Sequence, residues 1–138
     1  PYQLLDNFHV YQQSSNYNDM IYLRLAETYL ILAEAQFKLG ETVDAATTIN
    51  VLRARANAPL ATAAQINLNL ILDERSRELV TEEHRRYTLL RTNTWFDRTK
   101  LYNTNVSTLI TPRDTILPIP QSVIDANLTK PMAQNPGY

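Results

Sequence analysis

Glutamates and arginines recur at helical spacing in two segments of the chain. Carboxylates gathered on one surface are the groups that general acid–base catalysis uses. Glu27 and Glu34 lie seven residues apart, so they share a helix face with Arg24. The second segment holds pairs three or four residues apart, which are neighbours on a helix. These pairs are Glu74 with Arg77, Arg75 with Glu78, and Glu82 with Arg85 or Arg86.

The arginine beside each carboxylate decides between a catalytic and a structural interpretation. A guanidinium within reach favours the ionised carboxylate, and an ionised carboxylate is no proton donor at neutral pH. The pattern therefore favours a partly buried ion-pair network between helices. Because removal of one partner leaves a buried charge uncompensated, we expect Glu78→Ala to unfold or aggregate the domain.

Other catalytic and metal-binding arrangements are missing from the sequence. The two histidines, His9 and His84, have no metal-ligand spacing, and there is no cysteine. The two glycines, Gly40 and Gly137, are too few for a phosphate-binding loop, and no serine has a G-x-S-x-G setting. The sequence therefore predicts a protein that is not an enzyme and binds neither a cofactor nor a metal.

Aromatic side chains are the remaining candidates for a binding site, because flat rings stack on the apolar faces of sugars. Helical periodicity assigns Tyr22, Tyr29 and Phe37 to the core. Three other aromatic residues lie near helix ends or loops, and packing is the favoured interpretation for each of them as well. These ligand-binding candidates are Trp95, Tyr102 and Tyr11.

Length and composition indicate an ordinary globular domain. The chain has 138 residues, 44% of them apolar and 20% charged. With 13 basic and 14 acidic residues the net charge is −1, which gives no electrostatic support for nucleic-acid binding. No apolar run reaches the length of a membrane-spanning helix. The chain begins at Pro1 without a signal-like segment, so we interpret it as the end of a longer protein.

The first half of the chain predicts a helical hairpin. Residues 1–20 are polar and aromatic, which predicts a loop or tail. Helical periodicity runs from Ile21 to Leu39, where Gly40 ends the helix. A second helix follows from about Thr42 to Asn57, and so short a connection makes the two antiparallel. The hairpin resembles a tetratricopeptide unit at Tyr29, Leu32, Ala33, Gly40, Ala45 and Ile49.

The second half predicts further helices and then a long ordered tail. A third helix is expected from about Ala63 to Glu83, with Thr62 as its cap. Pro118 and Pro120 fix an extended strap that closes the fold. Shorter helices are expected at 84–91, 95–101 and 121–127, and the helix 95–101 has Asn93 or Thr94 as its cap. Extended segments are expected at 106–110 and 115–119. The predicted class is all-α: a tetratricopeptide-like hairpin, more helices and a proline-containing tail.

Four segments resemble the carboxy-terminal part of the RagB/SusD family, and the resemblance covers residues 21–138. They are the helix Tyr22 to Ala35, the glutamate–arginine block Ile71 to Arg91, Leu117-Pro-Ile-Pro-Gln-Ser122, and Gln134-Asn-Pro-Gly-Tyr138. The resemblance implies a SusD-like fold of the alpha-alpha superhelix type over residues 21–138. It also implies that most ligand contacts belong to an amino-terminal part absent from this sequence.

By the same resemblance, the protein is expected to be a non-catalytic surface lipoprotein that binds an oligosaccharide or another nutrient. Family members lie on the extracellular face of the outer membrane, held by a lipid anchor, and deliver nutrients to a TonB-dependent, SusC-like transporter. This segment would be scaffold with transporter contacts. Two alternatives stay open from the residues alone: a peptide-binding tetratricopeptide-like adaptor, and a glycoside hydrolase fragment with two unpaired carboxylates in a cleft.

Overall fold

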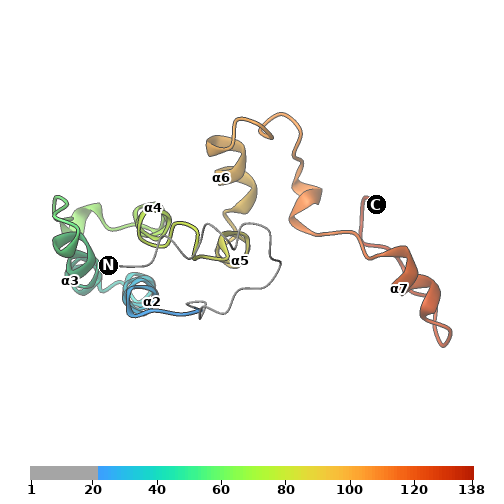
Figure 1. Cartoon of the computed structure of the whole chain (residues 1–138), viewed down its shortest axis with the longest axis horizontal. Coiled ribbons are helices and arrows are strands. Elements are labelled where there is room, and N and C mark those ends of the chain that lie inside the picture. The colour runs from blue at the N-terminus through green and yellow to red at the C-terminus, as the bar shows by residue number, and fades with distance from the viewer. Residues whose placement is uncertain (1–21) are drawn as a thin grey trace, which may run out of the picture. The chain divides into compact units, whose positions relative to one another are not determined.

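The computed structural model describes residues 22–138, which fall into two compact units that divide after Glu83. Six α-helices and two 3₁₀ turns account for the regular structure of this range, and the described residues contain no strand (Figure 1). The all-α prediction is therefore confirmed. Tyr11, one of the aromatic candidates, and the predicted tail 1–20 lie outside the described residues.

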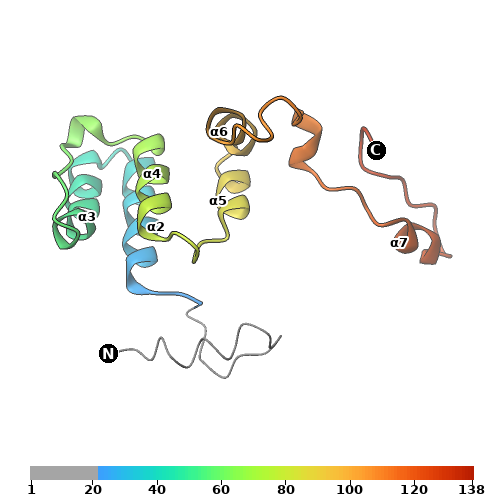
Figure 2. The same cartoon turned by 45° about the horizontal axis from the view of Figure 1, so that its top comes forward.

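The first unit is built from three α-helices and one 3₁₀ turn (Figure 2). These elements are α2 (Leu25–Lys38), α3 (Thr42–Arg55), η1 (Ala63–Gln65) and α4 (Leu68–Glu78). Helices α2 and α3 form the predicted hairpin. Gly40, with a φ of 84°, adopts the left-handed conformation between them, and the N–H of Glu41 reaches back to the carbonyl of Gln36 at 2.9 Å. This pattern closes the last turn of α2.

Small residues bring the helices of the first unit together. One cluster joins α2, α3, η1 and α4, and a second joins α2, α3 and the end of α4. The first consists of Ala33, Ala45, Ala46, Ile49, Ala61, Ile66 and Ile71, and the second of Ala26, Leu30, Leu52 and Leu79. Alanines at the contacts allow close approach of the backbones, and the branched residues fill the remaining space.

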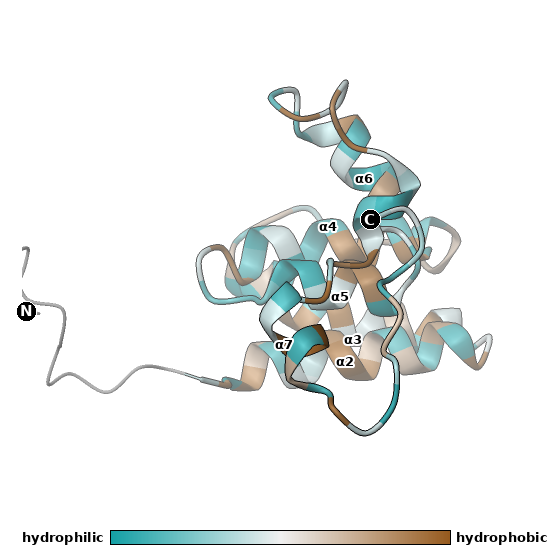
Figure 3. Cartoon of the chain, turned by 90° about the vertical axis from the view of Figure 1, so that its right-hand side faces the viewer, coloured by the Kyte–Doolittle hydropathy of each residue, from teal (hydrophilic) through white to brown (hydrophobic). Residues whose placement is uncertain are grey.

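Helix α2 carries two apolar stripes, and only the one through Ala26, Leu30 and Ala33 is buried, whereas Leu25 and Leu32 of the other are exposed. Tyr22 is 82% exposed, so the prediction that it belongs to the core was wrong for this chain, and Leu32 of α2 is 46% exposed. Hydrophobic residues recur along α2 (Figure 3), and some of them, such as Leu25 and Ile31, are exposed. The helix turns its smaller side chains toward α3 and α4. Tyr29 and Phe37, also assigned to the core, are partly buried against it.

The predicted helix 63–83 is interrupted and shorter. Residues 63–65 form a single 3₁₀ turn, in which the side chain of Gln65 accepts the N–H of Thr62 at 2.8 Å. The chain then extends so that Ile66 enters the core, and Asn67 caps α4 by accepting the N–H of Leu70 at 2.9 Å. Burial of Ile66 and this cap outweigh the propensity for one continuous helix.

The second unit contains α5 (Arg85–Arg91), α6 (Trp95–Tyr102), η2 (Pro112–Thr115) and α7 (Gln121–Ala126), which confirms three predicted helices. Thr94, one of the two predicted caps, occupies the N-cap position of α6 but makes no side-chain cap hydrogen bond there. Residues 106–110 are turns rather than an extended segment, because the N–H groups of Leu109 and Ile110 bond locally to the carbonyl of Val106.

Candidate functional site

One charge cluster of the first unit centres on Glu78, the last residue of α4. Its carboxylate accepts a hydrogen bond from Arg24, which precedes α2, at 2.7 Å, and another from Arg55, at the end of α3, at 2.7 Å. Arg24 also binds Glu82 at 2.5 Å and donates to the main-chain carbonyl of Glu78. Three helix ends therefore meet at one carboxylate.

The environment of Glu78 settles its protonation state. Its side chain is only 8% exposed, and burial by itself raises the pKa of a carboxyl group. The hydrogen bonds and charges of Arg24 and Arg55 outweigh that burial, so the pKa of Glu78 is lowered from its ordinary value. Conversely, Glu82 first and then Glu78 raise the pKa of Arg24. Both shifts favour the ionised form of each group at neutral pH.

A second cluster surrounds Arg75, whose side chain is 3% exposed. Its guanidinium binds Glu27 of α2 at 2.9 Å and Glu83 at 2.5 Å. Glu82 and Glu83 are adjacent, yet they bind arginines of different clusters. The turn before them makes this divergence possible, because Thr81 has a φ of 67°, in the left-handed region.

A third cluster joins α3 to α4 through Glu74. This buried carboxylate accepts from Arg53 at 2.6 Å and from Arg77 at 2.7 Å. Glu34 is also buried, and Lys38, one turn later in α2, binds it at 2.8 Å. Each carboxylate of the three clusters is thus bound by at least one arginine, and Glu34 is bound by a lysine of its own helix.

Two of the pairings expected from spacing differ in the structure. The Glu74–Arg77 pair is present, whereas the expected Arg75–Glu78 pair is wrong, because each residue binds partners on other elements. Spacing had paired Glu82 with Arg85 or Arg86, and in the first unit Glu82 binds Arg24. Tertiary contacts bring opposite charges closer than the helix surface does, so they displace the local pairs.

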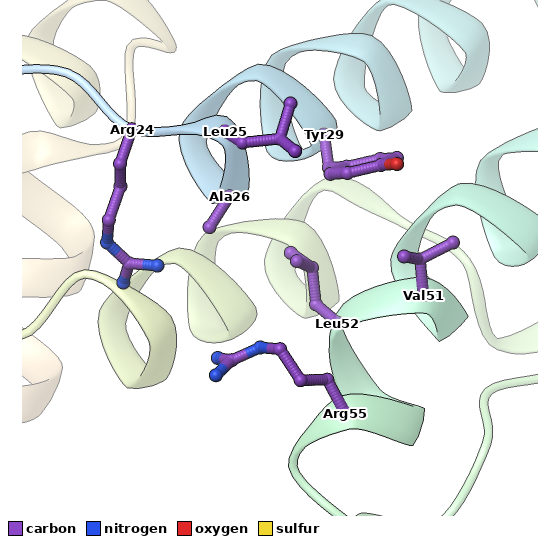
Figure 4. A pocket seen from close by; sticks show the side chains of 7 residues that line it. All are labelled: Arg24, Leu25, Ala26, Tyr29, Val51, Leu52 and Arg55. Atoms are coloured by element: carbon purple, nitrogen blue, oxygen red, sulfur yellow. The ribbon is translucent and has the colours of Figure 1, made fainter.

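An apolar hollow of about 420 Å³ lies beside the Glu78 cluster, between α2 and α3. Its lining comprises Arg24, Leu25, Ala26, Tyr29, Val51, Leu52 and Arg55. In Figure 4 the two guanidinium groups lie at the end of the hollow away from Tyr29 and Val51. The hollow therefore combines an apolar floor with one charged end.

The two described aromatic candidates lie in the second unit and differ in exposure. Trp95 is half-buried, and the guanidinium of Arg86 lies 4.4 Å from its ring centroid, so this face is already occupied. Tyr102 is 64% exposed, with Arg98 5.0 Å from its ring. Within residues 22–138, no group of acidic, histidine or cysteine side chains is arranged to hold a metal ion. No helix in that range combines the length and hydrophobicity needed to cross a bilayer.

Comparison with known proteins identifies the family. The family model described as SusD family matches residues 4–138, nearly the whole chain. The chain belongs to the SusD family. No solved structure matches the chain significantly.

Two curated SusD-type proteins are similar to this chain. A SusD-like protein of Formosa agariphila is 34% identical, with 97% of this chain and 27% of the relative covered. The starch-binding protein SusD of Bacteroides thetaiotaomicron is 36% identical, with 87% of this chain and 22% of the relative covered. The chain therefore spans about a quarter of the length of these relatives.

In the described part of the first unit, sequence reasoning missed four ion-pair residues of this SusD-family chain, one of which is Lys38. Arg53 and Arg55 end α3, and Glu83 follows the strained turn. Two basic residues in the last turn of α3 are a recognisable signal, since they suit the negative end of a helix. Their partners on α4 could not be assigned without the packing of the helices.

Proposed function

We propose that this chain is the scaffold segment of a non-catalytic nutrient-binding protein, with an oligosaccharide as the nutrient. The family match over residues 4–138 carries the proposal. The starch-binding name of one relative supports a glycan ligand. Because the chain spans about a quarter of such relatives, most ligand contacts are expected outside it.

The charge clusters support a structural rather than a catalytic role. A glycosidase needs two carboxylates about 5–10 Å apart across an open cleft, one of them protonated. The side chains of Glu74 and Glu78 are instead each only 8% exposed and are bound to arginines, and the pKa of Glu78 is lowered. Such groups join helices, and the proposal assigns them no reaction.

The proposed location is the extracellular face of the outer membrane, with a lipid anchor in the full-length protein and a TonB-dependent transporter as partner. Within this segment, the apolar floor of the hollow is the proposed contact surface. Leu25 is 68% exposed and Val51 is 46% exposed at its edge. Exposed apolar surface of this kind is typical of protein contacts.

Glycan binding tests the proposal directly. Full-length protein should bind immobilised oligosaccharide without releasing shorter sugars, as measured by affinity electrophoresis and by chromatography of the products. Tyr102→Ala and Trp95→Ala test the two described aromatic candidates, with Tyr87→Ala, another exposed tyrosine of the second unit, as control. Release of sugar products by the purified protein would contradict the non-catalytic role.

Transporter contact needs a separate experiment. Val51→Glu places a charge at the hollow and should abolish co-purification of the transporter while glycan binding is retained. Val43→Glu is the matched control, since Val43 is also exposed on α3 but does not line the hollow. Equal loss of transporter co-purification in both variants would contradict the hollow as the contact surface. Capture of peptides in place of a transporter would favour the adaptor alternative.

A further inference from the structure

The strap, residues 116–120, lacks two of the main-chain donors that hold extended chain in a sheet. Pro118 and Pro120 have no N–H, which leaves Ile119 as the donor between them. The described residues 92–138 also contain no buried hydrophobic side chain. Neither a strand ladder nor a core therefore explains the conformation of the strap.

The side chain of Gln134 binds both main-chain groups of Ile119. Its amide oxygen accepts the N–H of Ile119 at 2.7 Å, and its amide nitrogen donates to the carbonyl of the same residue at 2.8 Å. The next side chain, Asn135, donates to the carbonyl of Leu117 at 2.8 Å. Two consecutive amide side chains thus replace the partner strand that the prolines prevent.

The last two residues make a second set of contacts. The hydroxyl of Tyr138 donates to the carbonyl of Ile116 at 2.8 Å. Arg113 donates to the carbonyl of Gly137 at 2.8 Å and lies 4.5 Å from the centroid of the Tyr138 ring, a cation–π geometry. The chain turns back after α7 to reach this position (Figures 1 and 2).

Gly137 is required at this point for two independent reasons. Its φ is 92°, which side chains rarely adopt, and a Cβ placed there would lie 2.6 Å from Cδ of Arg113. Gly40 has a similar φ of 84° but open space around the Cβ position. Substitution at Gly40 therefore introduces backbone strain alone, whereas substitution at Gly137 introduces the same strain and a clash with Arg113.

We propose that residues 134–138 form a latch that recognises the strap and Arg113 in the same chain. The recognition site is a proline-interrupted extended segment, and its ligand is an amide-rich peptide that ends in glycine and tyrosine. The closed latch turns residues 120–133 into a loop that contains α7. This helix has six residues and none of them is buried, so it is too short to persist without such closure.

Hydrogen exchange of the whole chain, followed residue by residue by NMR, tests the latch. In Gly137→Ala and in Gln134→Leu, exchange of the Ile119 amide should accelerate about tenfold, the scale for loss of one hydrogen bond, and the amides of α7 should accelerate with it. Gly40→Ala should strain the α2–α3 turn and leave Ile119 protected. Unchanged exchange of Ile119 in both latch variants would overturn the proposal.

Protein concentration distinguishes a latch within one chain from exchange between copies. Protection of Ile119 should be the same in dilute and concentrated samples, because the tethered latch has a fixed effective concentration. Protection that is lost on dilution would mean that the latch of one copy binds the strap of another, and this too would overturn the proposal.

Discussion

Arg24 and Glu78, separated by 54 residues, join the start of α2 to the end of α4. The guanidinium binds the carboxylate of Glu78 at 2.7 Å and also its main-chain carbonyl. The last carbonyls of a helix have no partner within the helix, so Arg24 supplies one and neutralises a charge with the same group. This double contact ties the end of α4 to the residue that precedes α2.

Replacement of Glu78 should destabilise the protein. We expect Glu78→Ala to lower the free energy of unfolding by about 3 kcal/mol, because Arg24 and Arg55 lose their shared anion in a partly buried setting. Urea unfolding followed by circular dichroism measures the change. Asp44 is an exposed carboxylate on α3, and Asp44→Ala should change the free energy of unfolding by less than about 0.5 kcal/mol. A Glu78 variant that unfolds like the wild type would contradict a structural network.

The lowered pKa of Glu78 makes this contribution depend on pH. Between the folded and unfolded pKa values the unfolded state binds more protons, so stability rises with pH in that window. The contribution is complete above the unfolded pKa of about 4.3 and is lost as pH falls through the folded value. The stability difference between wild type and Glu78→Gln should therefore shrink from pH 7 to pH 3. A constant difference would show that the carboxylate has the same pKa in both states.

Substitutions of Leu30 and Leu32, which lie on different apolar stripes of α2, should differ sharply in their effect on the free energy of unfolding. Leu30 is fully buried, so Leu30→Ala should cost about 2–5 kcal/mol in unfolding free energy. Leu32 is 46% exposed, and Leu32→Ala should cost less than about 1 kcal/mol in this chain. Thermal unfolding of both variants makes the comparison. Equal losses would mean that the outer stripe is covered in solution.

The left-handed conformation of Thr81 should be a source of strain. This conformation costs a residue with a side chain about 1–2 kcal/mol, so Thr81→Gly should stabilise the fold by about 0.5–1 kcal/mol after the entropy of glycine is counted. Asn93, with a φ of 55°, is the matched control, because asparagine tolerates this region and Asn93→Gly should gain little. Differential scanning calorimetry of the two variants checks the difference. A destabilised Thr81→Gly protein would mean that the side chain has a role of its own.

Local signals in the sequence determined most of the helices and where the hairpin turns, although not the interruption between η1 and α4. Gly40, the periodicity around Leu30 and Ala33, and the prolines of the strap each act within a few residues, so they can be recognised without the fold. The family could be recognised for the same reason, since its motifs are short and contiguous.

Only the tertiary structure decided which surfaces and charges meet. Spacing on one helix predicted Arg75 with Glu78, whereas packing gave Arg75 to Glu27 and Glu83, and Glu78 to Arg24 and Arg55. Likewise, the choice between the two apolar stripes of α2 depended on the side that α3 and α4 cover. A local pattern lists the partners within one or two turns, but a charge or an apolar side chain responds to the nearest partner in space.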